Sequence, residues 1–191
     1  MTTSDPATWV ERHGNVLYRY ALLRTQDAAL AEDLVQETFL AALGARARFS
    51  GQSTEQTWLI GILKHKMIDH FRAQAGARAE QALADDADYL DGLFSSTGHW
   101  AQPPAAWASP ERALETEDFW RVFRACIRNL PDHLADLFIL REINDLPSQD
   151  LCKVLEISTT NNMWVMLSRA RMRLRECLDK HWFNKAGARG A

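Results

Sequence analysis

The chain has 191 residues, of which 47% are hydrophobic and 25% charged, and its formal net charge is −3. This composition is typical of a globular protein with one or two small cores. The N-terminus lacks a basic segment followed by an apolar run, and the longest aliphatic stretch of the first half, Trp58–Leu63, is far shorter than the roughly 20 residues that span a bilayer. We therefore expect neither secretion nor membrane insertion, and a cytoplasmic location.

The three cysteines, Cys126, Cys152 and Cys177, are widely spaced and form no CxxC pair. Their odd number favours a reducing compartment and argues against a disulfide framework. We expect Cys152 to be a small core residue. Cys177 and His181 stand at i and i+4 and could form a ligand pair for zinc, but no third ligand has a suitable spacing. We therefore expect no metal site and no cofactor.

The charge is distributed unevenly along the chain. Residues 1–76 are neutral, residues 77–120 carry a net charge of −7, and residues 121–191 carry +4. The acidic stretch also contains glycine, proline and serine without a sustained period, as linkers do. The predicted organisation is a first unit over residues 8–76, a flexible acidic linker over 77–112 and a second unit over 113–183.

Helical periodicity recurs before and after this linker, whereas strand signals are nearly absent. The first unit is predicted to contain helices over residues 9–23, 27–43 and about 53–73. The second unit is predicted to contain helices over residues 110–129, 132–142, 148–155 and 159–180. Gly44 is a plausible end of the second helix, and Ser148 a plausible cap of its own helix. The predicted fold class is all-α, with two small helical domains.

Residues 146–162 have the pattern of a helix-turn-helix: a short helix, a tight turn and a longer helix. The apolar residues Leu151, Leu155 and Ile157 would hold the two helices at an angle. In the longer helix, four arginines within residues 169–175 lie off the apolar stripe, and only Glu176 and Asp179 are acidic residues nearby. A solvated charged face is the plain interpretation. The polar residues at the start of this helix favour DNA contact, because base edges and phosphates are met there.

The first unit carries a surface of another kind. One face of the helix over residues 27–43 combines Asp33, Gln36, Glu37 and Leu40, and taken alone it would be a solvated face. The loop and helix that follow, residues 46–76, carry a net charge of +3 together with several aromatic residues. Aromatic rings near cations suit unpaired bases, which stack on the rings while their phosphates meet the cations.

Together these stretches resemble a bacterial RNA polymerase sigma factor of the sigma-70 family, in the extracytoplasmic-function (ECF) group. The sequence AEDLVQETFL at residues 31–40 is similar to region 2.2 of that family. The sequence WLIGILKHKMIDHFR at residues 58–72 is similar to regions 2.3 and 2.4. Residues 130–175, which end in RARMRLR, resemble region 4. The resemblance implies a sigma region 2 bundle, a linker and a sigma region 4 helix-turn-helix.

The resemblance also implies roles for individual residues. Polymerase binding, to the β′ clamp helices, is implied for Asp33, Leu34, Gln36, Glu37 and Leu40. Recognition and melting of the −10 element are implied for Arg46, Arg48, Phe49, Trp58, Lys64, His65, Lys66 and Arg72. Recognition of the −35 element is implied for Ser158, Thr159, Thr160, Asn161, Asn162, Trp164, Ser168, Arg169, Arg171 and Arg173. The implied partners are core polymerase, including its β subunit, promoter DNA and an anti-sigma factor. No catalysis and no small-molecule substrate are implied.

The chain departs from the family pattern in three places. It has His65 where asparagine is common, and Glu156 in the helix-turn-helix turn where glycine is common, although glutamate tolerates a positive φ less well. The recognition helix carries Met163–Met166 where relatives carry basic residues. Trp164 and Met166 could pack inward or contact thymine methyl groups.

Two other functions fit parts of the sequence. The first is a two-domain helix-turn-helix regulator that binds DNA without polymerase, against which the region 2 motifs argue. The second is a helical metal-dependent enzyme or metal sensor built on Cys177 and His181.

Overall fold

A computed structural model of the chain describes residues 5–75 and 116–183, and the predicted linker lies outside these ranges. In the described ranges all regular elements are helical, which confirms the predicted all-α class. The first unit contains η1 (Pro6–Thr8), α1 (Trp9–Thr25), α2 (Ala28–Ala45), η2 (Arg46–Arg48) and α3 (Glu55–Ala75). The second unit contains α6 (Glu117–Arg128), α7 (Asp132–Phe138), η3 (Ile139–Ile143), α8 (Ser148–Val154), α9 (Thr160–Leu178) and η4 (Asp179–Phe183). None of the described helices is long and apolar enough to cross a membrane.

The helix ends follow local hydrogen bonding. Asp27 caps α2, because its carboxylate accepts from the amide of Leu30 at 3.1 Å, and Thr159 caps α9 in the same way. The predicted role of Gly44 is wrong. The helix passes through it to Ala45 and then tightens into η2, so no left-handed residue is needed there. Ser148 is not a cap either, because it is the first residue of α8 and the capping position is occupied by Pro147.

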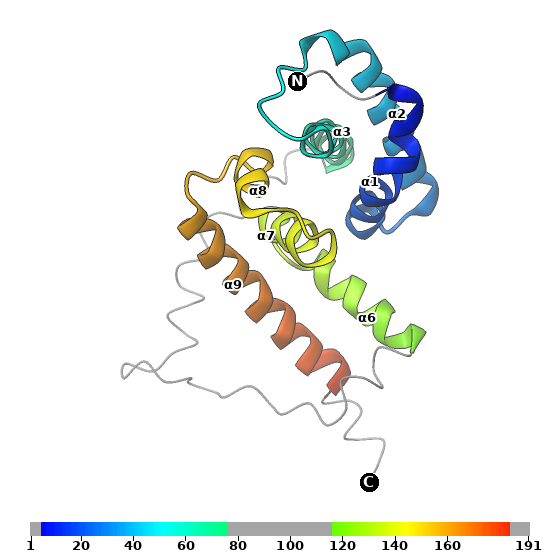
Figure 1. Cartoon of the computed structure of the whole chain (residues 1–191). Coiled ribbons are helices and arrows are strands. Elements are labelled where there is room, and N and C mark those ends of the chain that lie inside the picture. Colours follow the sequence, from blue (N-terminus) through cyan, green and yellow to red (C-terminus); the bar gives the residue numbers. More distant parts are fainter. Residues whose placement is uncertain (1–4, 76–115, 184–191) are drawn as a thin grey trace.

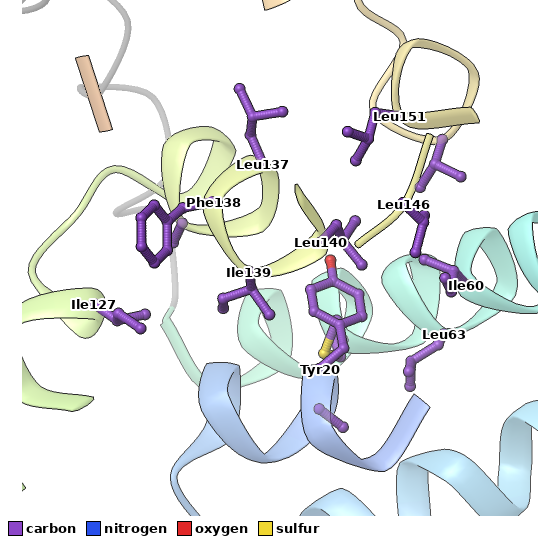
Figure 2. Close-up of a cluster of buried hydrophobic side chains, with 14 of the residues drawn as sticks. Tyr20, Ile60, Leu63, Ile127, Leu137, Phe138, Ile139, Leu140, Leu146 and Leu151 are labelled. Atoms are coloured by element: carbon purple, nitrogen blue, oxygen red, sulfur yellow. The ribbon is translucent and has the colours of Figure 1, made fainter. Parts of the chain in front are cut away.

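The two units pack against each other and bury side chains in one continuous core. Figure 2 shows Tyr20 and Leu63 of the first unit beside Ile139 and Leu140 of the second, and all four side chains are fully buried. In Figure 1, α7 and α8 lie next to α1 and α3 of the first unit, whereas α9 lies on the far side of α7. The core therefore holds α9 and the acidic face of α2 on different sides of the molecule.

The prediction that the cysteines form no disulfide framework is wrong for two of the three. Cys126 in α6 and Cys177 near the end of α9 form a disulfide, with Cα atoms 5.7 Å apart although 51 positions separate them in the sequence. The antiparallel packing of α6 on α9 brings them together, and wide sequence spacing gave no sign of it. Cys152 is a free, half-buried thiol that packs against the core.

Candidate nucleic-acid and polymerase interfaces

Helix α9 presents a buried apolar stripe and an outward polar and basic face. Met163, Leu167, Ala170 and Leu174 are buried, as the predicted stripe requires. Seven of the ten residues predicted to meet the −35 element are exposed: Ser158, Thr159, Thr160, Asn161, Asn162, Ser168 and Arg171. Trp164 is also exposed, whereas Arg169 and Arg173 are half-buried. The helix-turn-helix thus leaves one end and one side of its second helix open.

The turn before α9 has the backbone shape expected of a helix-turn-helix. Glu156 adopts a φ of 57°, in the left-handed region of backbone conformations. The family commonly has glycine at this position, and glutamate tolerates a positive φ less well. The amide of Ile157 donates to the carbonyl of Cys152 at 2.9 Å and closes the turn. Leu151 is buried, and Leu155 and Ile157 are half-buried and pack against the core, as the predicted apolar wedge requires.

Two neighbouring residues of η3 brace one side of α9. Arg141 lies over the ring of Trp164, 5.4 Å from its centre, and donates to the carbonyl of Leu146 at 2.8 Å. Glu142 accepts from Arg171 at 2.8 Å. The sequence offered no sign of Glu142 as a neutralising partner, because it lies 29 positions away from Arg171. Trp164 therefore packs outward on an arginine, and the alternative of an inward position is excluded.

Helix α2 presents the face that resembles the polymerase-binding surface. Asp33, Gln36, Glu37 and Leu40 are all exposed, and Leu40 keeps 68% of its surface accessible. Leu34 keeps only 5%, so in this structure it supports the face from the core. Single exposed leucines are common on protein surfaces, so the assignment of this face to a protein partner comes from the family resemblance.

The loop before α3 gathers aromatic rings beside exposed cations. Trp58 packs on Phe49 with ring centres 5.0 Å apart, and on Trp9 at 6.0 Å. Arg46 and Arg48 of η2 are exposed next to this group. Phe49 and Trp58 are half-buried, so part of each ring remains open for stacking.

The basic residues of α3 do not share one face. His65 and Arg72 are exposed. Lys64 donates to the carbonyl of Val154 at 3.1 Å and so lies against the second unit. Lys66 pairs with Glu37 of α2 at 2.9 Å. The structure therefore separates the predicted −10 residues into an exposed set and a set already engaged within the molecule.

The carboxylate of Glu55 organises the start of α3 through contacts with α1 that the sequence did not indicate. Glu55 accepts from the indole nitrogen of Trp9 at 2.9 Å and meets Nε2 of His13 at 2.9 Å. Arg12 lies 3.7 Å away. These contacts hold Trp9 and hence its partner Trp58. Glu55 is thus a positioning residue for the aromatic group, and only the contact between α1 and α3 reveals it.

A buried ion pair joins the two units. Asp136 of α7 accepts from the hydroxyl of Tyr20 at 2.9 Å and lies 2.7 Å from Nε of Arg24. Burial raises the pKa of Asp136, and the charge of Arg24 opposes this only in part. Burial, followed by the charge of Asp136, raises the pKa of Tyr20 well above its ordinary value. Burial alone would lower the pKa of Arg24, but its acidic partners raise it.

A cavity of about 490 Å³ lies beside this ion pair, between the two units. Its walls include Lys64 and Phe71 of α3, Leu155 of the turn and Met166 of α9. Met166 thus faces the first unit, and Trp164 points away from it. The alternative of an inward position holds for Met166 only.

The comparisons with known proteins agree with this arrangement. Residues 9–76 match the family Sigma-70 region 2, and residues 120–174 match Sigma-70, region 4. A probable RNA polymerase sigma factor of Haemophilus influenzae is 36% identical over 163 residues, which cover 84% of this chain and 83% of that protein. The ECF RNA polymerase sigma factor SigM of Bacillus subtilis is 29% identical over 166 residues, covering 87% of this chain and 90% of SigM.

A solved structure shares the fold. The sigma factor RpoE of Bartonella quintana, in a crystal with the anti-sigma factor NepR, superposes with a TM-score of 0.62 over 91% of this chain and 96% of RpoE, at 21% identity. The order of the two matched regions, the helix-turn-helix and the exposed face of α2 lead to one conclusion: the chain belongs to the RNA polymerase sigma factors of the sigma-70 family, in the ECF group.

Proposed function

We propose that this chain binds core RNA polymerase in the cytoplasm and directs promoter-specific initiation of transcription. The observation that carries the proposal is the presence of both family regions in one chain, each with an open surface of fitting chemistry. The face of α2 offers Asp33, Gln36, Glu37 and Leu40 to the polymerase. The outward face of α9 offers hydrogen-bonding side chains and cations to duplex DNA.

In this proposal region 2 captures unpaired bases of the −10 element. Phe49 and Trp58 supply partly open rings, and Arg46 and Arg48 supply nearby positive charge for phosphates. Capture of unstacked bases favours the melted DNA, because the protein binds it better than the duplex. Lys64 can join this surface only when region 4 moves away, since its ammonium group is bonded to Val154. The chain contributes binding and positioning to initiation and no catalytic group.

We further propose that an anti-sigma factor binds the chain and keeps it from the polymerase until the chain is released. The solved relative RpoE is bound to an anti-sigma factor, and this chain shares its fold over nearly its whole length. Release from such an inhibitor would make the surfaces of α2 and α9 accessible to polymerase and DNA together.

The test is reconstituted transcription with core polymerase, purified chain and a library of promoter fragments. Specific initiation is expected with the chain and not without it. Asp33→Ala should weaken core binding at least fivefold, about 1 kcal/mol, while leaving binding of duplex DNA unchanged. Glu32→Ala is the matched control, because it removes the same charge from the same helix about a quarter turn away. A chain that binds duplex DNA but not core polymerase would instead support a helix-turn-helix regulator.

A further inference from the structure

Two large apolar side chains stand side by side on the open surface of the recognition helix. Trp164 keeps 42% of its surface accessible and Val165 keeps 40%, although both lie in the second turn of α9. Neither contributes to the buried stripe of Met163, Leu167 and Ala170. Valine is also a poorer helix former than most residues, so its place here is not explained by helix stability.

The direction of these side chains follows from the helix geometry. At 100° per residue, Val165 points almost directly away from the buried stripe, and Trp164 lies at the edge of the open face. Met166 comes next and turns toward the cavity against region 2. Trp164 and Val165 therefore remain open even while the two units are packed together.

The surroundings indicate what this apolar pair faces. Asn161 and Ser168 are exposed one turn before and one turn after Val165. Arg169 follows one turn later on nearly the same side of the helix as Val165, and Arg141 lies over the ring of Trp164. These two arginines give this surface the positive charge that phosphates require. A helix with such flanks enters the major groove, where the C5-methyl group of thymine is the apolar feature that a base pair presents.

We propose that Val165, with Trp164 beside it, reads a thymine methyl group in the −35 element. Arg141 acts as a positioning residue, because its guanidinium group stacks on Trp164 and is itself anchored on the carbonyl of Leu146. This contact fixes the ring of Trp164 at the edge of the open face, where it would form one wall of the methyl site. The proposal rests on the proposed function, and it adds Val165 to the residues that the sequence singled out.

The test uses the full chain with core polymerase and a −35 element selected from a randomised duplex. Each thymine of the selected element is then replaced by deoxyuridine, which removes only the methyl group. Binding is expected to fall about fourfold at one or two positions, the effect of one buried methyl group. In Val165→Ala the ratio of thymine to uracil binding at one of these positions should fall below twofold.

Val10→Ala is the matched control, since Val10 is an exposed valine of α1 with 65% of its surface accessible. It should leave the ratio unchanged. A ratio near one for the unmodified chain, or an equal ratio in Val165→Ala, would overturn the proposal while specific binding persists. If no −35 sequence is selected at all, the proposed function itself fails, so the two failures are distinguishable. Trp164→Ala provides a second variant, and it should reduce the same ratio at the same position.

Discussion

The sharpest prediction concerns Asp136, the buried carboxylate that joins region 4 to region 2. It is 7% exposed, and its partners Tyr20 and Arg24 lie on the other unit, 116 and 112 positions earlier in the sequence. Asp136→Ala would leave a buried hydroxyl group without its acceptor and a buried guanidinium group with only Asp132 beside it. The side chain of Asp132 is 84% exposed, so solvent screens its charge.

The expected cost follows from these environments. Removal of one partner from a buried ion pair costs about 3–5 kcal/mol, because the other charge stays buried. We expect Asp136→Ala to lower the free energy of unfolding by about 3 kcal/mol, the lower end, since burial already works against the charge of Asp136. Asp132→Ala removes the exposed partner of the same arginine and should cost less than about 1 kcal/mol.

Urea denaturation of the full chain, followed by far-ultraviolet circular dichroism, measures both variants. The unmodified chain should unfold in one transition, because its two units share a core. Asp136→Ala should shift the midpoint downward and separate the transitions of the two units. If Asp136→Ala and Asp132→Ala had equal effects below 1 kcal/mol, the ion pair would not hold the units together and the reasoning would be wrong.

Three further predictions follow from the same contacts. The raised pKa of Asp136 means that the folded chain retains this proton more readily than the unfolded chain. The unmodified chain should therefore gain stability relative to Asp136→Asn as the pH falls from neutral, through that raised pKa, toward the ordinary pKa of aspartate. Urea denaturation of both chains at several pH values measures this difference. A loss of relative stability over the same range would contradict the raised pKa. Glu156→Gly should stabilise the chain by about 0.5–1 kcal/mol, because glycine adopts a φ of 57° without strain. The same change inside a helix, Glu32→Gly on the exposed side of α2, should destabilise the chain by about 0.5–1 kcal/mol, because glycine is a poor helix former. Equal signs of the two effects in thermal unfolding would refute the assignment. Reduction of the disulfide between Cys126 and Cys177, or replacement of both cysteines by serine, should lower the free energy of unfolding by about 4 kcal/mol, because the bond closes a loop of 51 positions. Titration of thiols in the denatured, unreduced chain checks the bond, and three reactive thiols would show that it is absent.

Patterns within one helix were sufficient for much of the fold. The spacing of three and four residues placed Leu167 and Leu174 on one stripe, and both are buried. The same rule assigned Asp33 and Glu37 to an exposed face of α2. Such predictions succeed because a helix repeats every 3.6 residues, so the face of a side chain depends only on its near neighbours. The family resemblance rests on the same local segments and is confirmed by the comparisons.

Contacts between distant segments were decided by the tertiary structure alone. Asp136 has ordinary neighbours in the sequence, and its burial against Tyr20 arises only when α7 packs on α1. The bond between Cys126 and Cys177 depends likewise on the packing of α6 on α9. The direction of Trp164 could not be read from periodicity, since a residue at the edge of a stripe turns either way until a partner such as Arg141 holds it. The spacing of residues within one helix carries no information about which distant residue packs against a given side chain, and that is the physical limit of the sequence patterns.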